Sequence, residues 1–306
     1  MLPDTARQTH AARHNAGSSR LLERRDFIVT LASIIGLAQP ACAGRATALN
    51  GGTRRLRRIG LQLYSLRDDA RRDLERTIAD IAVAGYHDVE LLGSMNNFGV
   101  SPTRLRAMLD RNNLRAPSTH VAGSALDDLG RQLDDAATLG HEYLTVASLP
   151  IAKPARLDDY RSWADRLNEA GRIARERGVW IGFHNHADDF AVIEGEVAYD
   201  LLAARTDPAV VRLQLDTGNL AMAGGDIMDY MRRFGERYWL FHIKDVPSLT
   251  ADSDTELGKG IINFRELLAS IENIDGKHLF VEQETYPGTP LESIRRDFAY
   301  LSRLRF

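Results

Sequence analysis

Two histidines and two aspartates follow an apolar run near the middle of the chain, in residues 179–190 (VWIGFHNHADDF). The apolar residues predict a buried strand, and His184 and His186 stand two positions apart at its end. Because successive side chains of a strand point to opposite faces, both imidazoles are expected on one face. Imidazole can bind a metal, transfer protons or form surface hydrogen bonds, so this segment alone leaves the chemistry open.

The same alternation collects further polar residues on one face of other expected strands, near their carboxyl ends. Asp216 shares its face with Gln214 and Arg212, and the other members of the set are Glu90, His120, His242, Lys244, Glu282 and Glu284. Imidazoles and carboxylates brought together in one place are costly to bury unless they have partners. A divalent metal accepts both ligand types, so the set predicts a metal site, with a hydrogen-bonded polar plug as the alternative.

The elements that must position these residues alternate regularly from Ile59 onward. Amphipathic segments such as 71–85, 156–178 and 290–304 predict helices. The expected strands are 59–66, 87–93, 115–123, 142–149, 180–186, 211–219, 238–246 and 278–284. Eight strand–helix pairs in about 250 residues predict a single-domain (β/α)₈ TIM barrel, with the polar set in its mouth. An open doubly wound sheet would carry a glycine-rich loop after its first strand, which this chain lacks there.

The first 43 residues have the plan of an export signal. The pair Arg24–Arg25 precedes an apolar stretch at 27–37, and Ala41-Cys42-Ala43 offers a small-residue cleavage site. The arginine pair resembles a twin-arginine signal, with an ordinary secretion signal or a surface amphipathic segment as alternatives. The sequence therefore predicts a signal peptide at 1–43, a flexible leader at 44–58, the barrel at 59–306, and a periplasmic or otherwise exported protein.

The charge balance narrows the partners. The chain has net charge −3, and removal of residues 1–43 would leave 34 basic and 39 acidic residues. No polybasic segment predicts a nucleic-acid partner, and the stretch at 27–37 is too short to span a bilayer. The oligomeric state stays open, a homo-oligomer included.

Six segments resemble a known family: "IGLQLYSLRDD", "GYHDVELLG", "FHNHADDF", "LQLDTGN", "FHIKDV" and "VEQE". In this order and spacing across 59–306 they resemble the sugar phosphate isomerase/epimerase-like family of the xylose isomerase-like barrels. The resemblance implies one divalent ion, manganese before magnesium, cobalt or zinc, with ligands Asp216, His242 and Glu282. The first glutamate ligand of the family falls on His184, which leaves His186 or Asp189 as alternatives.

The resemblance also implies a small carbohydrate as the substrate and partner, and a reaction that begins with removal of a proton beside a sugar carbonyl. Export favours an unphosphorylated substrate, and the expected activity is a 3-keto-glycoside lyase that works by β-elimination. Glu90, His120, His186 and Lys244 are the expected catalytic residues, with His186 or Glu90 as the proton shuttle. A keto-sugar isomerase or epimerase, an inosose dehydratase-like enzyme and a non-catalytic carbohydrate-binding barrel are the alternatives.

Overall fold

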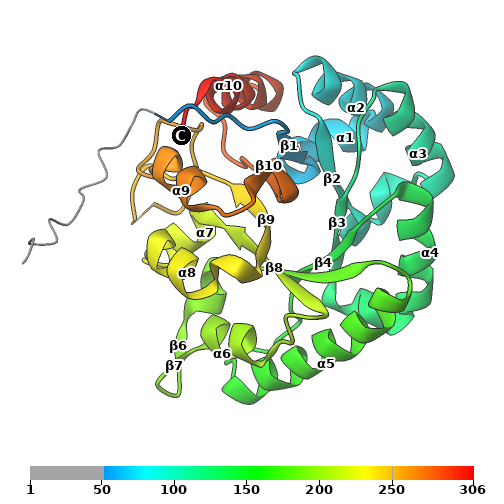
Figure 1. The fold of residues 1–306 in the computed structure, drawn as a ribbon. Helices are drawn as coiled ribbons and strands as arrows, with labels where there is room; N and C mark the ends of the chain where they lie inside the picture. Colours follow the sequence, from blue (N-terminus) through cyan, green and yellow to red (C-terminus); the bar gives the residue numbers. More distant parts are fainter. Residues whose placement is uncertain (1–51, 250) are drawn as a thin grey trace, which may run out of the picture. The chain divides into compact units, whose positions relative to one another are not determined.

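The computed structural model describes residues 52–249 and 251–306, and these form a closed barrel of parallel strands (Figure 1). The strands follow one another around the barrel in the order β1-β10-β9-β8-β5-β4-β3-β2. Their bounds are β1 Gly60–Gln62, β2 Asp88–Leu92, β3 Ser118–Ala122, β4 Tyr143–Ser148, β5 Trp180–His184, β8 Val211–Asp216, β9 Tyr238–Ile243 and β10 His278–Val281. The predicted single-domain TIM barrel is confirmed. The predicted signal peptide and residues 44–51 of the leader lie outside the described residues.

Helices surround the strands on the outside of the barrel (Figure 1). They are α1 Arg67–Arg72, α2 Leu74–Val83, α3 Pro102–Arg111, α4 Leu129–Leu139, α5 Leu157–Glu176, α6 Ala198–Arg205, α7 Thr217–Met222, α8 Ile227–Phe234, α9 Phe264–Ser270 and α10 Pro290–Arg303. None of the helices in the described part of the chain has the length and apolar character needed to cross a membrane.

Local sequence sets the bounds of the longer helices. Helix α10 begins after Thr289, whose side chain accepts from the backbone of Glu292 while Glu292 bonds back to Thr289, with Pro290 in the first turn. This reciprocal cap and an N-terminal proline are typical helix-start signals. Helix α4 ends at Gly140, whose φ of 78° lies in the left-handed region that glycine adopts without strain.

Several strands are shorter than their apolar patterns predict. Strand β5 ends at His184, and after Asn185 and His186 a short 3-10 helix begins, η4 Ala187–Phe190. A small antiparallel hairpin then precedes α6, formed by β6 Val192–Ile193 and β7 Glu196–Val197. His186 therefore lies beyond the strand at the N-cap of η4, and strict alternation does not fix its direction.

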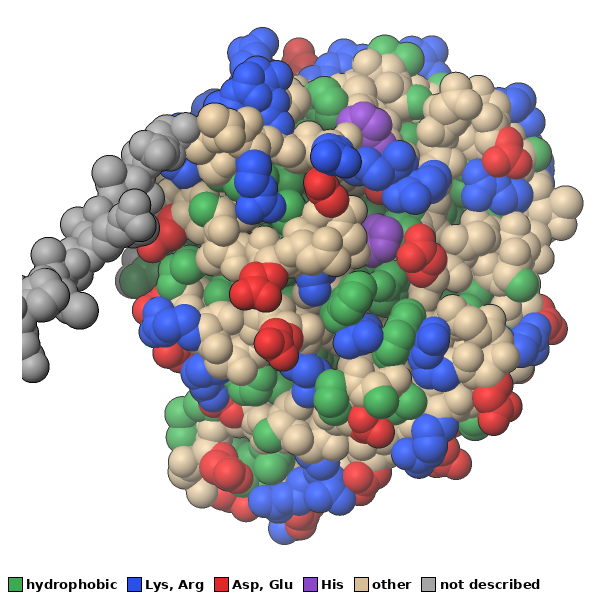
Figure 2. Space-filling view, in the orientation of Figure 1, with side chains coloured by type: hydrophobic (Ala, Val, Ile, Leu, Met, Phe, Trp, Pro, Cys, Tyr) green, Lys and Arg blue, Asp and Glu red, His purple; other side chains and the backbone are tan. Residues whose placement is uncertain are grey.

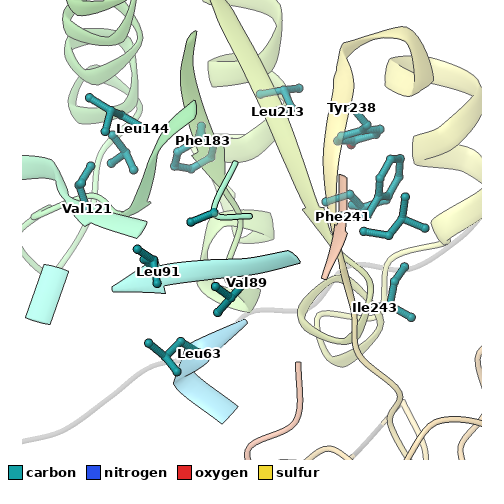
Figure 3. Close-up of a cluster of buried hydrophobic side chains, with 14 of the residues drawn as sticks. Leu63, Val89, Leu91, Val121, Leu144, Phe183, Leu213, Tyr238, Phe241 and Ile243 are labelled. Atoms are coloured by element: carbon teal, nitrogen blue, oxygen red, sulfur yellow. The ribbon is translucent and has the colours of Figure 1, made fainter. Parts of the chain in front are cut away.

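Outward-facing strand residues form the main hydrophobic core. Their side chains, among them Val89, Leu91, Phe183, Leu213 and Phe241, are buried in one cluster with the apolar faces of the helices (Figure 3). In a barrel, alternate strand residues point outward onto the helices and inward into the barrel, so each strand has an apolar outer face and a separate inner face.

The inner face changes character along the barrel axis. At the amino ends of the strands, Tyr143, Leu240 and Phe280 form a small apolar cluster with Trp180 and Trp239 packed against it. Further along, the buried polar residues are Gln62, Glu90, Ser118, Thr145 and Gln214. The carboxyl ends carry His120, His184, Asp216, His242, Lys244 and Glu282, also buried. Polarity thus rises toward the end at which barrel enzymes carry their sites.

Candidate metal centre at the barrel mouth

Three of the four predicted metal ligands come together at the carboxyl ends of β8, β9 and β10. The ligand atoms of Asp216, His242 and Glu282 all lie within 4.8 Å of one another, and the three residues are buried. The register explains the meeting, because Asp216 pairs directly with His242 across β8 and β9. Glu282 follows β10 immediately, where its Oε2 lies 3.0 Å from His242 Nδ1.

Three carboxylates surround the ring of His242. Its Nε2 lies 2.5 Å from Glu90 Oε2, and its Nδ1 faces Glu282 at 3.0 Å and Asp216 at 3.7 Å. Burial alone would lower the pKa of His242, but the charges of Glu282 and Glu90 outweigh it and raise this pKa well above its usual value. A ligand histidine that is oriented by a carboxylate on its other nitrogen is the usual arrangement at protein metal sites. Nδ1 is thus the nitrogen available to a metal, and Glu90 is the orienting carboxylate.

His184, the fourth predicted ligand, belongs to an adjoining histidine cluster. The ring nitrogens of His120, His184 and His242 also lie within 4.8 Å of one another. His184 Nδ1 lies 3.1 Å from Gln214 Oε1, which leaves its Nε2 as the free nitrogen. Burial, reinforced by the charge of His242, holds the pKa of His184 well below its usual value. The ring is therefore neutral, which is the form that binds metals.

Lys244 is the cation that balances the buried carboxylates. Its Nζ lies 3.3 Å from Asp216 Oδ2, 2.8 Å from Glu282 Oε2 and 2.8 Å from Glu284 Oε1. Burial opposes the charge of Lys244, but Asp216 and Glu282 raise its pKa well above the usual value. Gly218 makes room for the lysine stem, because a Cβ there would lie 2.6 Å from Lys244 Cγ. The glycine of "LDTGN" is thus part of the site.

The donor set fits a divalent cation. Asp216 Oδ2 is buried and, apart from its ion pair with Lys244, receives no hydrogen bond, whereas Asp216 Oδ1 accepts one from the backbone of Asn219. The charged groups buried here are the carboxylates of Glu90, Asp216 and Glu282 against the cations of His242 and Lys244, which leaves one negative charge in excess. Buried charge of this kind requires a counter-charge. Mixed carboxylate and imidazole ligands match a divalent transition metal.

Glu90 lies below the mouth and is fully buried. It accepts from Gln62 Nε2 at 2.7 Å, Ser118 Oγ at 2.6 Å and Gln214 Nε2 at 2.9 Å. Burial would raise the pKa of Glu90, but the charges of His120 and His242 lower it to about 2. Gln62 and Ser118 were not among the predicted site residues. Alternation could have found Ser118, which stands two positions before His120, but β1 carries no second polar residue to mark the face of Gln62.

His120 occupies the position between these groups. Its Nε2 lies 2.8 Å from Gln214 Oε1 and 3.2 Å from Glu90 Oε2. Its ring stacks on that of His242 with centroids 5.0 Å apart. Burial lowers the pKa of His120. Through these contacts with Gln214, Glu90 and His242, His120 positions the neighbouring polar side chains from inside the barrel.

The other residues of "FHNHADDF" lie at the rim. His186 is exposed, with its ring centroid 4.8 Å from that of His184. Asp189 caps η4: its Oδ2 accepts from the backbone of His186 and its Oδ1 from Tyr160 Oη. Asp189 is not a member of either potential metal cluster in the described residues. Asn185 bonds to the backbone of Asp216 in both directions, at 2.9 and 3.3 Å, and so joins the ends of β5 and β8.

The fold and this mouth define a TIM barrel with a buried histidine–carboxylate cluster at the carboxyl ends of its strands. A family model for the xylose isomerase-like TIM barrel matches residues 58–304, and the chain belongs to this family. The predicted family is therefore confirmed.

Individual relatives are more distant. Inosose dehydratase 2 from Bacillus cereus is 24% identical over 263 residues, which cover 73% of this chain and 87% of that protein. A solved sugar phosphate isomerase/epimerase from Parabacteroides distasonis superposes with a TM-score of 0.70 at 23% identity, covering 80% of this chain and 98% of the other. The zinc-bound IolI protein superposes with a TM-score of 0.63 at 16% identity, covering 78% and 95%.

Proposed function

We propose that this chain is a divalent-metal-dependent enzyme that eliminates a β-oxygen from a 3-keto-glycoside. The observation that carries the proposal is the buried triad Asp216, His242 and Glu282, with the buried ring of His184 beside it. The names of its relatives, inosose dehydratase and sugar phosphate isomerase/epimerase, both denote carbohydrate chemistry. A dehydratase, like the proposed lyase, removes an oxygen leaving group.

In this proposal the mouth residues divide between holding the metal and orienting its ligands. Asp216, His242 and Glu282 would hold the ion, with His184 as the fourth ligand. A divalent ion bound there supplies positive charge to a ketone oxygen and so acidifies the neighbouring C–H bond. Glu90 fixes the tautomer and the angle of the His242 ring. Lys244 neutralises the carboxylates and is close enough to assist developing negative charge on the substrate.

The elimination requires a base and an acid above the cluster. The C2–H bond breaks toward the base, its electron pair forms the C1–C2 double bond, and the C1–O bond breaks as the leaving oxygen takes a proton. His186 suits this transfer because it is exposed at the rim and in ring contact with His184. Glu90 does not, since it is fully buried and already bonded to Gln62, Ser118, Gln214 and His242. We therefore assign the proton shuttle to His186.

The second candidate is a keto-sugar isomerase or epimerase, which shares the metal triad and the first proton transfer. Against simple two-base epimerisation stands His184, because the resemblance places a glutamate at this position in the epimerases. A neutral imidazole there removes one of the two opposed carboxylates.

Proton NMR in D₂O on the metal-loaded protein with a simple 3-keto-glucoside tests the proposal. We expect loss of the C2 proton signal together with release of the aglycone. Exchange of that proton without cleavage would support the isomerase or epimerase. No exchange by a fully metal-loaded protein would contradict both and favour a barrel that only binds carbohydrate.

Two finer expectations belong to this proposal. We expect manganese to be the preferred ion, which competitive loading with magnesium, cobalt and zinc measures. We also expect export directed by Arg24 and Arg25. Replacing both with lysine should keep the protein in the cytoplasmic fraction, because twin-arginine export typically requires the pair. Unchanged export would contradict the twin-arginine assignment.

A further inference from the structure

A pocket lies on the outer flank of the barrel, between α9, α10 and the loop that precedes α9. Its volume is about 560 Å³. Its apolar lining comes from Leu257, Ala299, Tyr300 and Leu304, and its charged lining from Glu256, Lys259, Arg265, Arg296, Arg303 and Arg305. None of the mouth residues lines it. Whatever binds there is therefore not the substrate of the metal site.

The one carboxylate that lines this pocket, Glu256, already has ion-pair and hydrogen-bond partners. Glu256 is buried, and its carboxylate contacts Lys259, Arg296 at 2.5 Å and Ser293 Oγ at 2.9 Å. Those cations lower the pKa of Glu256 to about 2 against the opposing effect of burial. The carboxylate is thus a fixed anchor that holds Arg296 and Lys259 at the pocket wall.

The remaining cations have no such partner. Most of the arginines that the structure describes form ion pairs with a carboxylate. Within the described residues, Arg265, Arg303 and Arg305 form none, and all three line this pocket. Lys and Arg side chains gather over the α10 end of the molecule in Figure 2. On a chain of net charge −3, this concentration is local.

We propose that this pocket binds the phosphate group of an organic phosphate. Four of its five cations are arginines, whose planar fork matches phosphate oxygens better than lysine does. Tyr300 adds a hydroxyl that has no hydrogen-bond partner among the described residues, and Leu257 and Leu304 offer apolar contact to a carbon skeleton. The phosphate belongs either to a soluble ester or to a phospholipid headgroup, and both present the same anion.

The test compares the double variant Arg265→Gln/Arg303→Gln with a matched control, Arg172→Gln/Arg295→Gln. All four arginines are exposed and free of ion pairs within the described residues, and the two variants change net charge equally. Calorimetry with glycerol 3-phosphate probes the soluble source. Co-sedimentation with phosphatidylglycerol vesicles, against phosphatidylcholine vesicles, probes the lipid source.

We expect the wild type and the control to bind one of the two probes, with affinity falling as salt rises. The Arg265/Arg303 variant should bind about 100-fold more weakly, since each lost charge-assisted contact is worth about tenfold. Its metal content and turnover should not change. Binding to neither probe, or equal loss in the two variants, would overturn the proposal. Because the metal site is untouched, these outcomes are independent of the lyase test.

Discussion

Both ends of the barrel hold positively charged side chains inside the ring of strands, but different groups stabilise the charge at each end. At the mouth, Lys244 and His242 are surrounded by carboxylates. At the base, Arg212 lies between the rings of Trp180 and Trp239, with its guanidinium carbon 3.9 and 4.3 Å from their centroids. Ring faces attract a cation without adding a counter-charge.

The difference separates function from stability. Carboxylates that pair with a protein cation can also bind a metal cation, so the mouth is suited to bind a metal. A cation enclosed by aromatic rings offers no ligand atoms, and Arg212 Nε and Trp239 Nε1 are in fact buried without hydrogen bonds. In TIM barrels generally, residues at the base contribute to stability and residues at the mouth to catalysis.

The largest effect should come from Asp216→Asn. Asparagine keeps the N-cap acceptor for α7 but removes the charge that the metal needs. We expect loss of metal after dialysis and a fall in turnover of about 10³-fold or more, measured by elemental analysis and the elimination assay. Asp226→Asn, at the N-cap of α8, is the matched control and should retain both. Full metal content in the Asp216 variant would refute the ligand set.

Lys244→Met should have the next largest effect. It leaves Asp216 and Glu282 without their cation, so the metal-free protein should be destabilised by about 3 kcal/mol. The metal should still bind and restore most of this loss, while turnover falls roughly 10- to 100-fold. Thermal unfolding with and without metal measures the split. Lys259→Met, which removes an exposed lysine from its pair with Glu256, is the control. A Lys244 variant with unchanged turnover would show that this lysine only fills space.

The sequence could predict which strand face some of these residues occupy, but not the contacts they make across the barrel. Alternation correctly placed Asp216, His242 and Lys244 on the inner face, because β8 and β9 pair without a register shift from Gln214 and Leu240 onward and the barrel forces their apolar faces outward. It could not give the contact of His242 with Glu90, which joins residues 152 positions apart. Such a contact depends on closure of the barrel.

At the amino ends of the strands, alternation again predicts the face of a residue but not its contacts. Alternation put Arg212 on the inner face with Gln214 and Asp216, which is correct. Its enclosure by Trp180 and Trp239 depends on which strands are neighbours: β8 lies between β5 and β9 in the barrel. His186 shows the opposite case. It was expected on the strand face of His184, but β5 ends first, because Asp189 captures the backbone N–H of His186 and starts η4.

Arg212→Met should affect stability alone. Methionine fills similar space but loses the cation–π contacts, so the free energy of unfolding should fall by about 1–2 kcal/mol. Metal content and turnover should match the wild type. Denaturant unfolding of Arg212→Met, Trp180→Leu and the double variant isolates the pairwise contribution. Loss of metal in Arg212→Met would break the separation between base and mouth.

The smallest effect concerns Lys277, which lies over the ring of Trp239 at 4.0 Å. Burial, reinforced by the charge of Arg212, lowers the pKa of Lys277 to about 8, against about 10.4 in an unfolded chain. Between these values the folded protein binds fewer protons at this site, so the free energy of unfolding should rise with pH across the window.

After allowance for solvent screening of this half-exposed group, the rise from Lys277 should be about 1 kcal/mol. Denaturant unfolding of wild type and Lys277→Met at pH 7.5 and 9.5 measures it, because the difference between their two slopes excludes every other titrating group. The variant should lack the Lys277 contribution while its metal content stays unchanged. Identical slopes would mean that Lys277 keeps an ordinary pKa in the folded protein, so that neither burial nor the charge of Arg212 disfavours its protonated form.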